Sequence, residues 1–268
     1  MSKSMESLCN AIKSLFDTHS RDLISESYEK SSEQLSALMA RQAVAEYLEK
    51  CAASIRGNYL AKGVFMHDLQ EMVRDTVDRE QYILDACKGK RVLHVGFADA
   101  PFETSLHVKI RSVAAATWGV DIDETAVEEY QGQTGDPRCE AGNVCGLKVI
   151  RPDSTGKPEF DVILVPELLE HVENVGIALT TVQVNCTAHK CPAIITVPNA
   201  FAFGNMFAAI EGKEVVHPDH RCWFSPQTLK KCINDAGLGL DEMKFYSPAD
   251  MLATPGLTKS GIIARVTA

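Results

Sequence analysis

The sequence lacks the features of several large protein classes. No apolar run approaches the ~18 residues that a transmembrane helix requires, so we expect no membrane span. The N-terminal segment alternates polar and apolar residues and contains no continuous apolar core of the signal-peptide type. The nine cysteines are scattered and include no Cys-x-x-Cys pair. This disfavours a disulfide framework and predicts reduced thiols in a cytoplasmic protein.

Basic residues are scarce relative to acidic ones. The 27 lysines and arginines are outnumbered by 36 aspartates and glutamates, which gives a formal net charge of −9. An acidic chain is a poor electrostatic match for nucleic acid and for anionic membranes, so we expect neither as a partner. The 268 residues contain no internal repeat and fit one large domain, or one domain with an appendage.

The residues that are present divide the chain into two regions. Residues 1–88 carry apolar side chains at helical spacing, and Asp78 followed by Gln81 predicts a capping box for a short helix that ends at Gly89. In residues 89–268, β-like runs alternate with helical segments, which predicts a doubly wound α/β fold with a parallel sheet. The expected strands are 91–96, 115–121, 160–166, 193–198, 240–246 and 261–266, and the expected helices are 124–130, 173–189 and 225–236.

Two motifs suit a nucleotide-like ligand. RVLHVGFADA places Gly96, Phe97 and Ala98 after a strand, where backbone amides of a doubly wound sheet meet such a ligand. With a single glycine, this motif alone is equally compatible with an ordinary strand-to-helix junction. WGVDIDETAV delivers Asp121 to the end of the next strand, where an acidic side chain binds a ribose diol. Asp123 competes for that role, or caps the following helix.

Five sequence blocks together resemble a class I S-adenosylmethionine-dependent methyltransferase of the small-molecule type. They are RVLHVGFADA, WGVDIDETAV, CEAGNV, FDVILVPELLEHVENV, and ITVPNAF with HPDHRCWFSPQTLKKCINDAGL. The resemblance runs from about Arg91 to Leu240. It implies a Rossmann-like sheet of seven strands with the last antiparallel, and S-adenosylmethionine as the cofactor. His94 stands where this family has an acidic residue, and Ala98 and Ala100 replace two of its glycines.

The same resemblance assigns a cofactor site and a role for residues 1–88. Asp121 would bind the ribose and Asn143 would meet the adenine amino group. The N-terminal region would form a lid over the substrate or a homodimer contact. The residues assigned to the cofactor are Gly96, Phe97, Ala98, Asp121, Ile122, Asn143, Val144, Pro166 and Glu167.

Histidines are the main candidates for the acceptor end of the site. Transfer to a hydroxyl requires a general base, and the HPDHR loop, which faces the substrate in similar enzymes, contains two histidines. His220 is the preferred base, with a structural hydrogen-bonding role as an equal alternative. His171 is a second candidate, although this position more often shapes the loop. The expected substrate contacts are His217, Asn199 and Phe203.

A metal site is the third interpretation of the HPDHR loop. Its His-x-Asp-His spacing offers suitable ligand types. No cysteine or glutamate at ligand spacing accompanies these residues. We therefore expect no metal.

The sequence predicts a methyltransferase acting on a hydroxyl or amine of a small molecule, such as a sugar or a natural-product intermediate. Pro166-Glu167-Leu168-Leu169 stands where an Asn/Asp-Pro-Pro-Tyr motif would indicate nucleobase or glutamine N-methylation. A non-catalytic binding or scaffold protein on the same fold is the alternative. It is motivated by the two alanines, each of which costs about 1 kcal/mol if the loop requires positive φ there. The lack of a full Gly-x-Gly-x-x-Gly disfavours a dinucleotide-dependent oxidoreductase.

Overall fold

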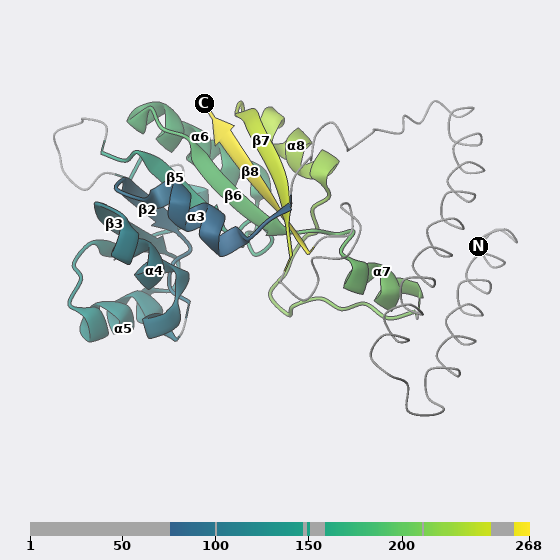
Figure 1. Ribbon diagram of the computed structural model, residues 1–268, viewed down its shortest axis with the longest axis horizontal. Coiled ribbons are helices and arrows are strands. Elements are labelled where there is room, and N and C mark those ends of the chain that lie inside the picture. Colours follow the sequence, from purple (N-terminus) through teal and green to yellow (C-terminus); the bar gives the residue numbers. More distant parts are fainter. Residues whose placement is uncertain (1–75, 100, 147–148, 151–158, 211, 248–259) are drawn as a thin grey trace, which may run out of the picture. The chain divides into compact units, whose positions relative to one another are not determined.

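The computed structural model describes residues 76–99, 101–146, 149–150, 159–210, 212–247 and 260–268 (Figure 1). The predicted helices of residues 1–75 lie outside this part of the chain. The unit that carries the sheet comprises Leu69–Met206 and Val215–Ala268. Its sheet has eight strands in the order β1-β7-β8-β6-β5-β2-β3-β4. β8 runs antiparallel to β6 and β7, and the other neighbouring pairs are parallel.

The elements alternate along the chain as βαβ units require. The strands are β1 (Thr76–Val77), β2 (Arg91–Val95), β3 (Ala116–Asp121), β4 (Cys139–Ala141), β5 (Val162–Pro166), β6 (Ala193–Pro198), β7 (Gly239–Tyr246) and β8 (Gly261–Thr267). The helices are α3 (Arg79–Cys87), α4 (Leu106–Val113), α5 (Glu124–Thr134), α6 (Val175–His189), α7 (Phe203–Ile210) and α8 (Pro226–Asp235). The short turns η1 (Phe102–Thr104) and η2 (Val144–Gly146) complete them.

Helices cover both faces of the sheet. Alternate strand residues point to opposite faces. Leu93 and Ile163 therefore belong to the cluster that includes residues of α6 and α8. Val92 and Val162 belong to the cluster that includes residues of α3 and α4. This two-sided burial explains why β5 and β6 are almost continuously apolar.

The sheet has one strand more than the seven expected. The additional strand, β1, has two residues and pairs in parallel with Phe245 and Tyr246 of β7. A two-residue strand is too short to show the alternation by which strands are recognised in a sequence. β1 and α3 precede the predicted boundary at residue 89, yet both belong to the sheet-bearing unit. The predicted N-cap of α3 is confirmed, since Asp78 accepts a hydrogen bond from the amide of Gln81 at 2.7 Å. The reciprocal bond of a capping box is replaced by one from the Gln81 side chain to Asp85 at 2.9 Å.

Gly261 leaves space for an aromatic ring on the neighbouring strand. It lies opposite Tyr246, and a Cβ atom at Gly261 would overlap that ring. The ring is held in place because the Tyr246 hydroxyl donates a hydrogen bond to Glu167 at 2.7 Å. We expect Gly261→Ala to lower the free energy of unfolding by about 1–3 kcal/mol, measured by denaturant titration.

A second glycine provides the matched control for this stability prediction. Gly132 lies inside α5, and no heavy atom outside the local helix lies within 4 Å of the position of its Cβ. Gly132→Ala should therefore stabilise the protein by about 0.5–1 kcal/mol. Equal stability of Gly261→Ala and the unsubstituted protein would contradict the prediction.

Candidate functional site

The site lies where the order of the parallel strands reverses. From β2 the chain continues to β3 and β4 on one side, whereas β5 is followed by β6 on the other side. In such sheets, ligands bind at the carboxyl ends of the strands around this switch point. The first residues beyond these strands therefore form the candidate site.

The turn after β2 requires glycine at its first position. Gly96 has φ +76°, and a Cβ atom there would lie 3.0 Å from the Leu168 side chain. Among the described residues other than glycine, positive φ occurs only at Glu167 and Lys190. Ala98 therefore occupies the turn without that strain, whereas Ala100, the other alanine that motivated the non-catalytic alternative, lies outside the described residues. The Phe97 side chain is buried, so only its backbone is available to a ligand.

Asp121 joins the end of β3 to this turn. Its carboxylate accepts hydrogen bonds from the amide of Ala98 at 2.9 Å and from the amide of Asp123 at 3.1 Å. Each carboxylate oxygen retains lone pairs that can accept bonds from hydroxyl groups. Asp123 instead accepts a bond from Ala126 and caps α5. The helix-cap alternative for Asp123 is thus confirmed.

His94 belongs to β2, directly before the turn, and is a neutral residue. Its Nδ1 atom lies 3.1 Å from Nδ1 of His107 in α4, and both rings are buried. Burial, followed by the charge of His107, lowers the pKa of His94 well below its ordinary value. Burial also lowers the pKa of His107 to about 3. The position that is acidic in the resembled family therefore holds a neutral histidine pair, whose second member the sequence did not reveal.

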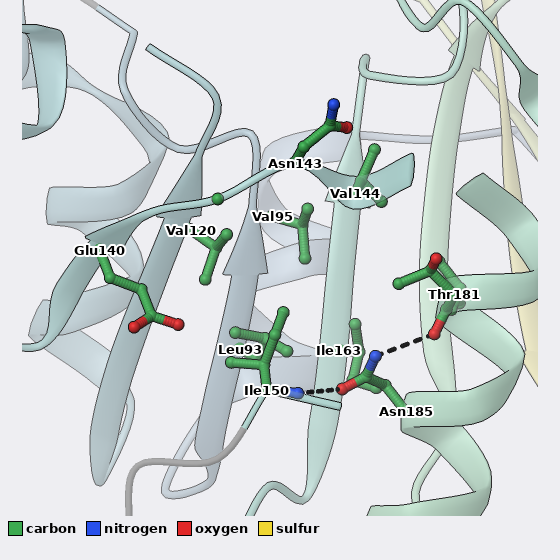
Figure 2. Close-up of a pocket in the computed structure, with 12 residues that line it drawn as sticks. Leu93, Val95, Val120, Glu140, Asn143, Val144, Ile150, Ile163, Thr181 and Asn185 are labelled. Atoms are coloured by element: carbon green, nitrogen blue, oxygen red, sulfur yellow. Dashed lines mark hydrogen bonds between the residues drawn. The ribbon is translucent and has the colours of Figure 1, made fainter. Parts of the chain in front are cut away.

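The predicted adenine contacts lie beside a small cavity between the sheet and α6 (Figure 2). Asn143 and Val144 line this cavity of about 40 Å³, which holds only a few water molecules. Asn185, another lining residue, is engaged internally with Ile150 and Thr181. The cavity is thus too small for an adenine ring. Ile122, directly after Asp121, exposes 68 % of its surface.

Glu167 is held by protein partners on the other side of the switch point. It follows the buried Pro166, and its carboxylate accepts hydrogen bonds from Tyr246 and Thr196, both at 2.7 Å. A guanidinium nitrogen of Arg79 lies 3.5 Å away. Glu167 also has φ 47°, a strained value of the kind found at functional sites. Because these partners engage the Glu167 carboxylate, we expect a ligand to contact the backbone of this turn instead.

Glu170 is a buried carboxyl group. Neither carboxyl oxygen has a hydrogen-bond partner within the described ranges. Burial, followed by the charge of Glu167, raises the pKa of Glu170 to about 8. Glu170 is therefore mainly neutral at pH 7, and its backbone rather than its carboxyl group contributes to the cluster described next.

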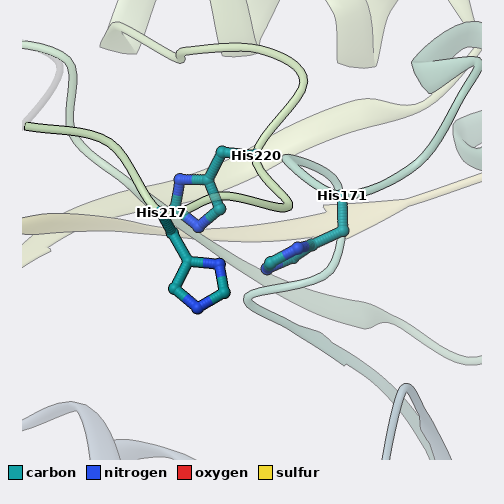
Figure 3. A group of neighbouring side chains, drawn as sticks. All are labelled: His171, His217 and His220. Atoms are coloured by element: carbon teal, nitrogen blue, oxygen red, sulfur yellow. The ribbon is translucent and has the colours of Figure 1, made fainter.

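Three histidines meet beyond the end of β5 (Figure 3). Ring nitrogens of His171, His217 and His220 all lie within 4.8 Å of one another. Arg221 creates this cluster, because its amide donates to the Glu170 carbonyl at 2.7 Å and its Nε donates to the His171 carbonyl at 3.0 Å. Partial burial, followed by the charges of His171 and His217, lowers the pKa of His220. The sequence indicated each histidine separately, and the structure brings them together.

The other two predicted substrate contacts are placed differently. Asn199 is fully buried, and its side chain accepts a hydrogen bond from the amide of Phe201 at 3.1 Å. This bond gives Asn199 a role in the turn after β6 rather than on an exposed substrate surface. Phe203 begins α7, and its side chain lies outside the described part of the structure.

The family of methyltransferase domains matches residues 65–242, which is most of the chain. Comparison with curated proteins gave no match. Among solved structures, the CcbJ methyltransferase of Streptomyces caelestis is 10 % identical with a TM-score of 0.50, over 70 % of this chain and 87 % of that one. The small RNA methyltransferase HEN1 is 13 % identical with a TM-score of 0.50, over 70 % of this chain and 24 % of that one. A Mesorhizobium loti S-adenosylmethionine-dependent methyltransferase is 14 % identical with a TM-score of 0.47, over 70 % and 95 %.

At identities of 10–14 %, these likenesses concern the fold alone. Because one of the similar proteins is an RNA methyltransferase, the fold does not support the expected exclusion of nucleic acid. None of the helices in the described ranges is long and apolar enough to span a membrane.

Proposed function

Since the chain belongs to the family of methyltransferase domains, we propose that it transfers a methyl group from S-adenosylmethionine to a hydroxyl or amine of a small molecule. The observation that carries this proposal is the histidine cluster, which lies just beyond β5 at the switch point. It supplies proton-accepting groups near the turn that would hold the cofactor.

The residues at the turn fit the cofactor. Gly96 allows the positive φ of the turn at the carboxyl end of β2, and Asp121 retains lone pairs for the ribose hydroxyls. The exposed Ile122 offers an apolar surface for the adenine ring, and Asn143 lies exposed after β4. When bound, S-adenosylmethionine supplies an electrophilic methyl group, which bonds to the acceptor atom as the carbon–sulfur bond breaks and leaves its electron pair on sulfur.

The histidines would prepare the acceptor. The lowered pKa of His220 keeps its ring neutral at pH 7 and thus able to accept the proton of an acceptor hydroxyl. His171 is the neighbouring candidate, with ring centroids 4.7 Å apart. A neutral amine needs only orientation, to which His217 and Phe203 would contribute. We further assign a lid or homodimer role to the part of residues 1–88 that precedes β1, and we propose a cytoplasmic location.

The acceptor is proposed to be a small molecule because of charge. A formal net charge of −9 opposes the approach of a phosphate backbone. A small uncharged or cationic acceptor meets no such repulsion. An RNA oligonucleotide is therefore the informative negative control for an acceptor screen.

Calorimetric titration with S-adenosylmethionine and S-adenosylhomocysteine tests the proposal. We expect micromolar binding of both, followed by transfer of a labelled methyl group to members of a panel of sugars and amines. The RNA oligonucleotide should remain unlabelled. Binding of neither ligand would contradict the enzyme and favour the non-catalytic alternative.

A further inference from the structure

The histidine cluster has the composition of a metal site. We propose that His171, His217 and His220 bind one divalent transition-metal ion, such as Zn²⁺ or Co²⁺, and leave a coordination position open for an acceptor oxygen. Only the identity of that oxygen rests on the proposed function. The sequence analysis expected no metal, because the HPDHR loop lacks further ligands at suitable spacing. The third ligand, His171, comes from a separate loop.

The spacing of the rings suits a shared ion. Coordination at ~2.0–2.1 Å in tetrahedral geometry places ligand nitrogens ~3.4 Å apart. The three nitrogens lie within 4.8 Å of one another, so closure requires movements of about 1.4 Å or less. The His217 side chain is 57 % exposed and can rotate, whereas Arg221 holds the loops of the other two histidines together. Figure 3 shows the three rings turned toward one another.

The chemistry of the cluster favours a transition metal over a structural histidine network. Imidazole suits zinc, copper, iron and nickel, and it coordinates in its neutral form. His220 Nδ1 is buried and has no hydrogen-bond partner in the described part of the chain. That absence is unexpected for a histidine whose role is to hydrogen-bond the loop. The Asp219 carboxylate, 3.8 Å from His217 Nδ1, places negative charge beside the cation.

Three protein ligands with a free position are typical of catalytic rather than structural metal sites. In the metal-bound protein, the imidazoles are ligands and no longer bases. The metal would then lower the pKa of the acceptor hydroxyl, whose proton leaves to solvent while its oxygen attacks the methyl group. This assignment explains why three histidines, rather than one, meet at the acceptor end.

Titration of the chelator-stripped full chain with Co²⁺ tests the site directly. We expect one equivalent to bind, with visible d–d absorption, no thiolate-to-cobalt band, and displacement by Zn²⁺. Gln substitutions of His171, His217 or His220 should each weaken binding about 100-fold or more. His19→Gln, a histidine of the N-terminal segment, is the matched control and should bind like the parent. Circular dichroism verifies that each variant is folded.

Three outcomes overturn the proposal: no cobalt spectrum, a thiolate band, or variants of the cluster that bind like the parent. Titrations with S-adenosylmethionine on the same samples separate it from the proposed function. Cobalt binding without cofactor binding supports the metal site and removes the proposed function. Methyl transfer that persists unchanged after the metal is stripped overturns the role of the metal in activating the acceptor.

Discussion

Replacing Asp121 with alanine is expected to lower the affinity for S-adenosylmethionine about 100-fold or more. Each hydrogen bond to a charged group contributes about 1.5–3 kcal/mol, and in the proposed cofactor site the carboxylate would accept two from the ribose. The substitution also removes the bond from the Ala98 amide that fixes the turn. Both losses act on the same binding equilibrium, which isothermal titration calorimetry measures directly.

Asp123→Ala is the matched control for Asp121→Ala. It removes a carboxylate two residues away that caps α5. We expect it to cost about 1 kcal/mol of stability and to leave cofactor affinity nearly unchanged. Similar affinities for Asp121→Ala and Asp123→Ala would show that Asp121 does not hold the ribose.

Replacing His220 with glutamine is expected to reduce kcat/KM for a hydroxyl acceptor by about 10²–10⁴-fold. Only the neutral ring can accept a proton or bind a metal, so activity should fall as the pH drops through its pKa. Because burial and its histidine neighbours lower that pKa, the midpoint of this acid limb should lie below the ordinary histidine value of about 6.5. The pH dependence of kcat/KM measures it in the unsubstituted enzyme.

His217→Gln tests the origin of the acid limb. It removes one of the charges that lower the pKa of His220, so the limb should move to higher pH. An acid limb that stays in place would mean that another group controls activity. Full activity of His220→Gln would exclude His220 from the chemistry.

The elements that local sequence determines were predicted well. Strands 193–198 and 240–246 match β6 and β7 within one residue, and the cap at Asp78 is confirmed. α4 was not predicted, although Ser105 caps it through the amide of Val108. Its LHVKIRSV sequence is short and mixed in polarity, so the helical period is hard to distinguish.

The candidate site was predictable residue by residue but not as an arrangement. Asp121 and Asp123 are both aspartates that follow the same strand, so the sequence alone did not decide which one was the ribose candidate. The observed cap of α5 assigns Asp123 to the helix, whereas Asp121 bonds to the turn after β2. The histidine cluster depends on Arg221 reaching the carbonyl of a residue 50 positions earlier. Such contacts between a side chain and a distant backbone group leave no periodic signal in a sequence.

The loop after β5 also links two binding events. Leu168 packs beside Gly96 in the turn that would hold the cofactor, while the carbonyl of His171 accepts the bond from Arg221. A shift of this loop on binding either ligand would thus be transmitted to the other ligand's residues. Thermodynamic linkage then requires reciprocity: by whatever factor the cofactor changes acceptor affinity, the acceptor changes cofactor affinity equally. The loop after β5 would be the coupling element, and the ternary complex is favoured only if both ligands stabilise the same position of this loop.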